Sequence, residues 1–167
     1  MTTISEAIHS VARKHIGTWE WADGHNPKVL AYYAASGHPE IRDDETPWCA
    51  AFVGAVLGEA GLPNTGSLLA RSYLKYGHHI DVSQARPGDI VVLTRGNSTW
   101  QGHVAFFDRL ENGCVYLLGG NQRDQVNISD YPASKIIGVR RAGALKARQN
   151  WFGVLTEFLT SLFGGLK

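Results

Sequence analysis

The sequence predicts an α+β fold in which helices come first and an antiparallel sheet follows. In the first half of the chain, apolar residues recur at helical spacing between residues that typically start and stop helices. After residue 87 the pattern changes to short segments rich in Val, Ile, Phe and Tyr, separated by turn residues. With 167 residues, 44% of them hydrophobic, the chain is long enough for one compact domain.

One of four expected helices is the most informative. Thr46 is a suitable N-cap and Pro47 suits the first helical position, so we expect a helix to begin there. Gly61 marks its end, and the segment between is apolar on nearly all sides, which predicts a buried helix. The other expected helices are Ser5–His15, Pro27–Ser36 and Leu68–Tyr76.

The second half predicts an antiparallel meander. Asn112-Gly113 is a strong hairpin signal between two of the strand-like segments. A sheet of this kind would pack on the buried helix. The expected strands are Asp89–Thr94, Gly102–Leu110, Cys114–Leu118 and Lys135–Arg141.

We expect one domain over residues 1–142, followed by a basic linker and an amphipathic helix within 143–167. The polar face of that helix has no Lys or Arg, which argues against an anchor in anionic lipid. Packing on the domain or a partner protein, contact with a membrane, and oligomerisation remain open. The residues on its apolar face are Trp151, Val154, Leu155, Phe158, Leu159 and Leu162.

Charge and composition limit the possible partners. The formal net charge of +1 gives no bulk attraction to nucleic acid or to an anionic membrane. Glu6 stands where a signal peptide needs positive charge, and no apolar run follows, so we expect synthesis in the cytoplasm without a signal peptide. No segment reaches the roughly 18 consecutive apolar residues of a membrane span. Two cysteines do not make a disulfide framework.

Cys49 is the candidate nucleophile. It would lie in the first turn of the buried helix, where unpaired backbone N–H groups and the helix dipole favour a thiolate. A backbone N–H at that position can also help to hold an oxyanion. The alternative is a buried structural cysteine, which location alone makes equally plausible.

His103 is the candidate general base. It stands early in an expected strand, and a hairpin would bring it opposite the end of the next strand, where Asn121 lies. An amide oxygen there would accept from one imidazole nitrogen and leave the other facing the sulfur. Gln122 is the alternative third residue, because only one of two neighbours in a strand faces inward.

These segments resemble the CHAP family (cysteine, histidine-dependent amidohydrolases/peptidases) and related papain-like cell-wall hydrolases. The resemblance rests on Pro47-Trp48-Cys49, Pro87-Gly88-Asp89 and Gly102-His103-Val104, in that order and spacing, and covers residues 20–141. The Gly119-Gly120-Asn121-Gln122 run is similar to a CHAP-like subgroup common in phages and prophages. The resemblance implies a papain-like fold, with Cys49 as nucleophile, His103 as base, Asn121 as orienting residue, and no metal or other cofactor.

Four further residues are candidate substrate contacts. Trp48 and Trp100 flank the expected nucleophile and base and are candidate walls of a substrate groove. Asp43 and Asp44 lie just upstream of Cys49, where they could bind an amine of a wall peptide. A solvated loop and a calcium-binding loop are the other interpretations of these carboxylates.

The resemblance implies a peptidoglycan hydrolase of the phage endolysin type, acting at the cell wall or in the periplasm after release or delivery. It would cut amide bonds of the stem peptide through a thioester, as an N-acetylmuramoyl-L-alanine amidase or as an endopeptidase. Two alternatives remain: a papain-fold acyl transferase or deamidase toxin acting on protein, and a non-catalytic wall-binding virion module.

Overall fold

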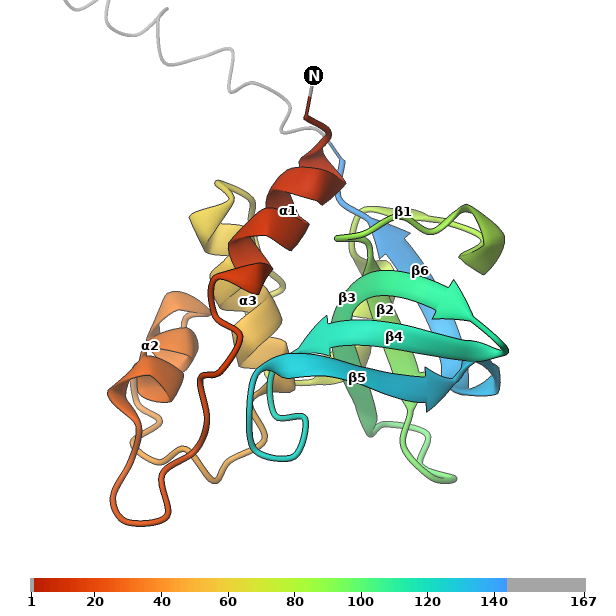
Figure 1. The fold of residues 1–167 in the computed structure, drawn as a ribbon. Helices are drawn as coiled ribbons and strands as arrows, with labels where there is room; N and C mark the ends of the chain where they lie inside the picture. The colour runs from red at the N-terminus through yellow and green to blue at the C-terminus, as the bar shows by residue number, and fades with distance from the viewer. Residues whose placement is uncertain (1, 144–167) are drawn as a thin grey trace, which may run out of the picture.

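The structure, a computed structural model, describes residues 2–143, so the expected linker and tail helix lie outside the described residues. Three helices lie on one side of a six-stranded antiparallel sheet (Figure 1). The order of helices, then strands, confirms the predicted α+β class. Among the described helices, none combines the length and apolarity that crossing a membrane requires.

The three α-helices begin at recognisable caps and meet around α3. Helix α1 (Ile4–Arg13) begins at a capping box of Thr3 and Glu6. The side chain of Asn26 caps α2 (Pro27–Ala35). Helix α3 (Cys49–Glu59) packs against α1, α2 and the sheet, and all of its residues from 49 to 57 are buried. The expected buried helix is therefore the centre of the fold.

The N-cap of helix α3 lies two residues later than expected. Trp48 occupies the N-cap position, and Cys49 is the first helical residue. The backbone N–H of Thr46 instead donates to Oδ1 of Asp43 at 2.7 Å, and the hydroxyl of Tyr33 donates to the Thr46 carbonyl. Thr46 is thus held in a turn before the helix, and the helix start moves to the nucleophile candidate itself.

The sheet contains the predicted meander. Asn112 and Gly113 both have positive φ angles (50° and 75°), as a two-residue hairpin turn requires. Strand β6 returns to pair with β2, which gives the order β1-β6-β2-β3-β4-β5. The strands are β1 (His78–His79), β2 (Ile90–Thr94), β3 (Gly102–Glu111), β4 (Cys114–Gly119), β5 (Asn127–Pro132) and β6 (Ile136–Arg141).

Five elements differ from the sequence prediction. The segment expected as a helix over 68–76 forms a 3₁₀-helix, η1 (Ala70–Lys75), and two more 3₁₀ turns, η2 (Val82–Gln84) and η3 (Ala133–Lys135), flank the strands. Strands β1 and β5 were not expected. Both lie at the edges of the sheet: β1 is exposed, whereas β5 is mostly half-buried and its polar sequence ends in a proline.

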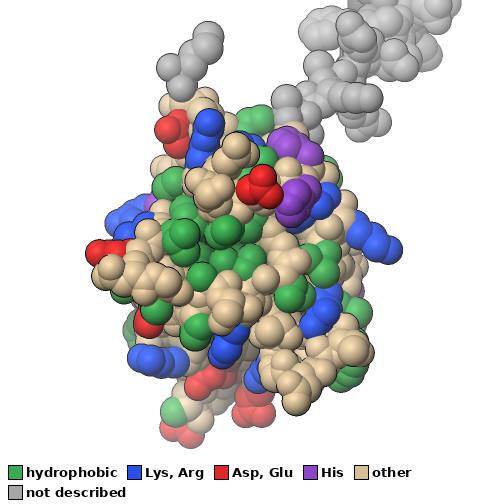
Figure 2. Space-filling view, turned by 90° about the vertical axis from the view of Figure 1, so that its right-hand side faces the viewer, with side chains coloured by type: hydrophobic (Ala, Val, Ile, Leu, Met, Phe, Trp, Pro, Cys, Tyr) green, Lys and Arg blue, Asp and Glu red, His purple; other side chains and the backbone are tan. Residues whose placement is uncertain are grey.

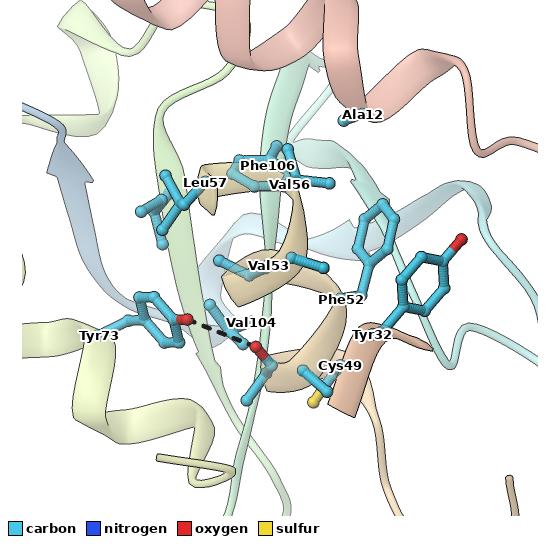
Figure 3. Packing of buried hydrophobic residues seen from close by; sticks show 14 of the residues in the cluster. Ala12, Tyr32, Cys49, Phe52, Val53, Val56, Leu57, Tyr73, Val104 and Phe106 are labelled. Atoms are coloured by element: carbon cyan, nitrogen blue, oxygen red, sulfur yellow. Dashed lines mark hydrogen bonds between the residues drawn. The ribbon is translucent and has the colours of Figure 1, made fainter. Parts of the chain in front are cut away.

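The two faces of the sheet each bury a hydrophobic cluster. Alternate residues of β2 point to opposite sides, so that Ile90 and Val92 join the cluster around α3, while Val91 and Leu93 join a second one. Figure 3 shows the first cluster, in which Phe52, Val53 and Phe106 fill the space between α3 and the strands. Seen from the strand side in Figure 2, hydrophobic side chains gather near the centre of the face, among polar and charged ones.

The Pro-Gly-Asp segment is a structural clasp. Asp89 is fully buried and accepts hydrogen bonds from the Ser5 hydroxyl (2.9 Å) and from Nε and Nη2 of Arg141 (2.9 and 2.7 Å). A Cβ on Gly88 would lie 1.8 Å from the Ser5 carbonyl oxygen, so only glycine allows α1 to approach this turn. The motif therefore joins the first helix to the last strand.

Candidate active site

Cys49 lies where the helical half of the molecule meets the sheet. Its sulfur is at the lower end of α3 in Figure 3, directed away from the core residues that surround the rest of the helix. As the first helical residue it is next to backbone N–H groups that have no partner within the helix. The side chain is only 8% exposed, and what is exposed opens into a cavity.

Two opposing effects act on the thiol of Cys49. Burial raises its pKa, but the hydrogen bond and positive charge of His103, together with the backbone N–H groups of Val104 and Ala50, lower it by more. The net direction is down from the ordinary value. The site therefore favours the thiolate, the form that attacks a carbonyl.

His103 is held by Gln122. His103 is the second residue of β3, and Nε2 of its imidazole lies 3.0 Å from Oε1 of the Gln122 amide. Gln122 is 2% exposed, and its NH₂ group donates to the carbonyl oxygens of Leu117 (3.1 Å) and Asn127 (2.8 Å). Because those two oxygens only accept, the NH₂ group must face them and Oε1 must face the imidazole.

The orientation of the Gln122 amide determines which nitrogen of the His103 ring carries the hydrogen. An amide oxygen accepts but does not donate, so Nε2 of His103 carries its hydrogen toward Gln122. The other nitrogen, Nδ1, is then left for the sulfur of Cys49. Burial lowers the pKa of His103, yet the hydrogen bond and charge of Cys49 and the bond to Gln122 raise it by more, so the net direction is up.

Asn121, the first choice from the sequence, does not occupy the position beside the imidazole. The register of β3 and β4, with Phe106 opposite Leu118, would put Asn121 opposite His103 if the strands continued. Strand β4 ends at Gly119, however, and Asn121 has a left-handed φ of 56°. The chain therefore leaves the strand pattern, Asn121 lines the cavity wall, and Gln122 reaches back to His103.

The turn that carries Gln122 is held by hydrogen bonds within the turn and by contacts from the segment after α1. Its N–H donates to the carbonyl of Gln125 at 3.0 Å, which closes a tight turn. The segment after α1 pairs with the same turn, through a bridge between Trp19 and Gln125 and a 2.8 Å hydrogen bond from the Glu20 N–H to the Asp124 carbonyl. The orienting amide is thus fixed by the helical half as well as by the sheet.

Tyr131 of β5 is a member of the site for which the sequence suggested no role. Its hydroxyl donates to Oε1 of Gln122 at 3.2 Å, and its ring lies 5.5 Å from that of His103. Burial raises the pKa of Tyr131 to about 12, so the hydroxyl stays neutral. Since β5 was not recognised as a strand, no sequence signal placed this residue beside the base.

Three of the four expected substrate contacts are engaged elsewhere and do not line the cavity. Trp48 is fully buried, and its Nε1 donates to Glu20 at 2.6 Å. Asp44 is 1% exposed, with Oδ1 paired to His25 Nδ1 (2.9 Å) and Oδ2 accepting from the backbone N–H of Asn26 (2.8 Å). Asp43 accepts from the turn before α3. These side chains shape the loop upstream of the nucleophile and do not line the cavity.

The fourth, Trp100, lies on the wall of the cavity and is 63% exposed. Its loop is held by Arg71 of η1, which donates from Nε to the Gln101 carbonyl and from Nη2 to the Ser98 carbonyl, both at 2.7 Å. The loop leads directly into Gly102 and His103. Arg71 thus positions both the wall and the start of the strand that carries the base.

The cavity is about 660 Å³ in volume, and Cys49 and His103 lie side by side on its lining. In Figure 1 the β2–β3 loop and the β4–β5 loop both hang below the sheet, on the side where α3 begins. Within residues 2–143, no group of three or more His, Cys, Asp or Glu side chains is placed to hold a metal ion. The other lining residues include Glu45, Thr46, Pro47, Leu68, Leu69, Ala70, Arg95, Gln101, Asn121, Tyr131 and Lys135.

Comparison with known proteins supports one family. Residues 41–121 match the family model described as the CHAP domain. No curated protein matches the chain. The segment matched includes all four of Cys49, Asp89, His103 and Asn121, and it ends one residue before Gln122.

Solved structures share the fold at low identity. The NlpC/p60 domain of the peptidoglycan hydrolase SagA is 20% identical, with a TM-score of 0.51 over 82% of this chain and 97% of that one. The P60 domain of an antigen from M. avium subspecies paratuberculosis is 18% identical (TM-score 0.51; 83% and 93%). A hypothetical invasion protein of Mycobacterium tuberculosis is 20% identical (TM-score 0.50), and the match covers 83% of this chain but only 61% of that protein. Residues 41–121 are therefore similar to the CHAP domain, and the described chain has a papain-like fold.

Proposed function

We propose that this protein is a peptidoglycan hydrolase that cuts amide bonds of the cell-wall stem peptide, with Cys49 as nucleophile and His103 as base. The observation that carries the proposal is the His103 ring, shared between the sulfur and Gln122 on the floor of an open cavity. The CHAP match and the likeness to domains such as that of the peptidoglycan hydrolase SagA support the wall as substrate.

Acylation begins with the thiolate of Cys49. It attacks the carbonyl carbon of the scissile amide, and the negative charge that develops on oxygen is held by unpaired backbone N–H groups at the start of α3. As the C–N bond breaks, the leaving amine takes the proton from Nδ1 of His103. A thioester on Cys49 and a free amine are the products of this step.

Deacylation uses the same base. Neutral His103 takes a proton from water, and the resulting hydroxide attacks the thioester carbonyl. The C–S bond breaks, the carboxylic acid leaves, and Cys49 returns to its thiolate. Gln122 accepts from Nε2 throughout, which keeps Nδ1 aimed at the reacting atoms.

Lysis of purified cell wall in a gel tests the assignment. Cys49→Ala is expected to abolish lysis, because no other group can form the thioester. Cys114→Ala is the matched control, since Cys114 begins β4 and does not line the cavity. Full lysis by Cys49→Ala, or by His103→Ala, would refute the corresponding role.

The bond that is cut is decided by mass spectrometry of the digested wall. A freed N-terminal L-alanine identifies an amidase, and a freed internal amine identifies an endopeptidase. Action at the wall after release or delivery, as in phage lysis, is part of the same proposal and is tested by adding the protein to intact cells and by expressing it inside them.

A further inference from the structure

A second cavity adjoins the catalytic one. Its volume is about 570 Å³, and it lies between η1 and the loop that precedes β3. Leu69 and Trp100 line both cavities, so these two side chains form a ridge between them. The full lining is Thr65, Leu69, Arg71, Ser72, Lys75, Tyr76, Thr99 and Trp100.

The ridge is exposed enough to support an extended ligand. Leu69 is 53% exposed and Trp100 is 63% exposed, and large apolar side chains at that exposure provide a contact surface for a chain lying across them. A substrate whose scissile bond lies at Cys49 can therefore continue over the ridge into the second cavity. A substrate confined to the catalytic cavity would not reach the second one.

The second cavity is positively charged. Its lining contains Arg71 and Lys75 and no Asp or Glu. The guanidinium of Arg71 already donates to the Gln101 and Ser98 carbonyl oxygens. The exposed ammonium of Lys75 takes part in no ion pair or side-chain hydrogen bond among residues 2–143, so it is the charge available to a ligand.

Hydroxyl groups complete the lining. Thr65 and Ser72 share a 2.8 Å hydrogen bond in which either hydroxyl can donate, and Thr99 is exposed beside them. Such groups pair with backbone amides of a peptide. A cation, hydroxyls and an aromatic wall without carboxylates fit a peptide that carries a carboxylate.

We propose that this cavity is a second substrate subsite that binds a carboxylate of the wall peptide through Lys75, with the peptide crossing the ridge of Leu69 and Trp100. The proposal rests on the proposed function, because it takes the wall peptide as the ligand. It adds a preference: wall peptides whose carboxylates are free bind more tightly than the same peptides with carboxamides in their place.

Binding to the inactive Cys49→Ala protein tests the subsite without turnover. Two soluble wall-peptide fragments that differ only in free carboxylates against carboxamides are titrated by calorimetry. The carboxylate form is expected to bind about fivefold more tightly, the range of an exposed ion pair. Adding Lys75→Met should abolish that preference, whereas adding Lys28→Met, on α2 and outside both cavities, should keep it.

The outcomes separate the two proposals. Equal binding of both fragments, or a preference that survives Lys75→Met, overturns the subsite even if the wild-type protein lyses cell wall. Loss of the preference in Lys28→Met as well would show a general charge effect and would also overturn it. Failure of the wild-type protein to cut any fragment overturns the hydrolase function, while the carboxylate preference still decides the subsite.

Discussion

Replacing Gln122 by methionine tests the orientation of the base. Methionine is close to glutamine in length but offers no strong acceptor for Nε2 of His103, which now lies 3.0 Å from the amide oxygen. Without that acceptor the ring is free to turn, and its proton no longer has a fixed place. Asn121→Gly is the matched control, because glycine accepts the left-handed φ of this position. Asn121 is the neighbouring amide and lines the cavity without contacting the ring in the described hydrogen bonds.

The expected loss follows from the bond that is removed. A hydrogen bond to a charged group contributes about 1.5–3 kcal/mol, which corresponds to a loss of about tenfold to 150-fold in kcat/KM if it acts in the transition state. The substitution also leaves the carbonyl oxygens of Leu117 and Asn127 without their donor, at a cost of about 2–4 kcal/mol in the free energy of unfolding. Urea titration measures this loss in the free energy of unfolding and shows whether the variant is folded under the conditions of the kinetic assay.

The pH profile separates orientation from a merely structural role. The pKa of His103 is raised above its ordinary value by Cys49 and by Gln122. Removing Gln122 lowers that pKa, so the imidazolium is lost at a lower pH. The alkaline limb of the pH profile of kcat/KM therefore shifts to lower pH. An unchanged alkaline limb with wild-type kcat/KM in Gln122→Met, or an equal loss in Asn121→Gly, would refute the assignment of Gln122.

Three further substitutions probe the frame around the site. Asp89→Asn removes a buried charge that faces Arg141 and should lower the free energy of unfolding by about 3 kcal/mol in urea titration; a loss below about 1 kcal/mol would contradict the clasp. Gly120→Ala would place a Cβ 2.5 Å from the Trp48 ring, so about 1–3 kcal/mol should be lost, together with activity, and a variant as stable as wild type would contradict this packing. Trp100→Ala should weaken binding of wall fragments without changing the rate at which iodoacetamide alkylates the nucleophile, and an altered alkylation rate would show that the loop acts on the sulfur itself.

Much of the fold could be predicted from periodicity and turn chemistry. The hairpin at Asn112-Gly113 and the apolar helix α3, which Gly61 follows just after the C-cap, both follow from local preferences, and the structure has both. The start of α3 did not follow, because Asp43 and Tyr33 take the backbone groups of Thr46 that a cap would have used. The local turn with Asp43 and the contact from Tyr33 on α2 together override a cap preference that is worth about 1 kcal/mol.

The third site residue shows where sequence reasoning ends. The inferred pairing of β3 with β4 is correct, and it would bring Asn121 opposite His103 in a continued ladder. The deciding fact is a left-handed φ at Asn121, which no alternation pattern reveals in a non-glycine residue. The choice between Asn121 and Gln122 as the partner of His103 therefore depends on the backbone path after Gly119, which the sequence pattern does not predict.

The way Gln122 is held also sets an order of events during synthesis. The nucleophile leaves the ribosome early, but the base gains its fixed partner only after Asn127 has been made and β4 has paired with β5. The contact of His103 with Cys49 joins residues 54 positions apart, so it carries a larger loop-closure cost than the local contacts around Gln122. A nascent or partly unfolded chain accordingly carries a cysteine without an oriented base, and its reactivity appears only when the domain is complete.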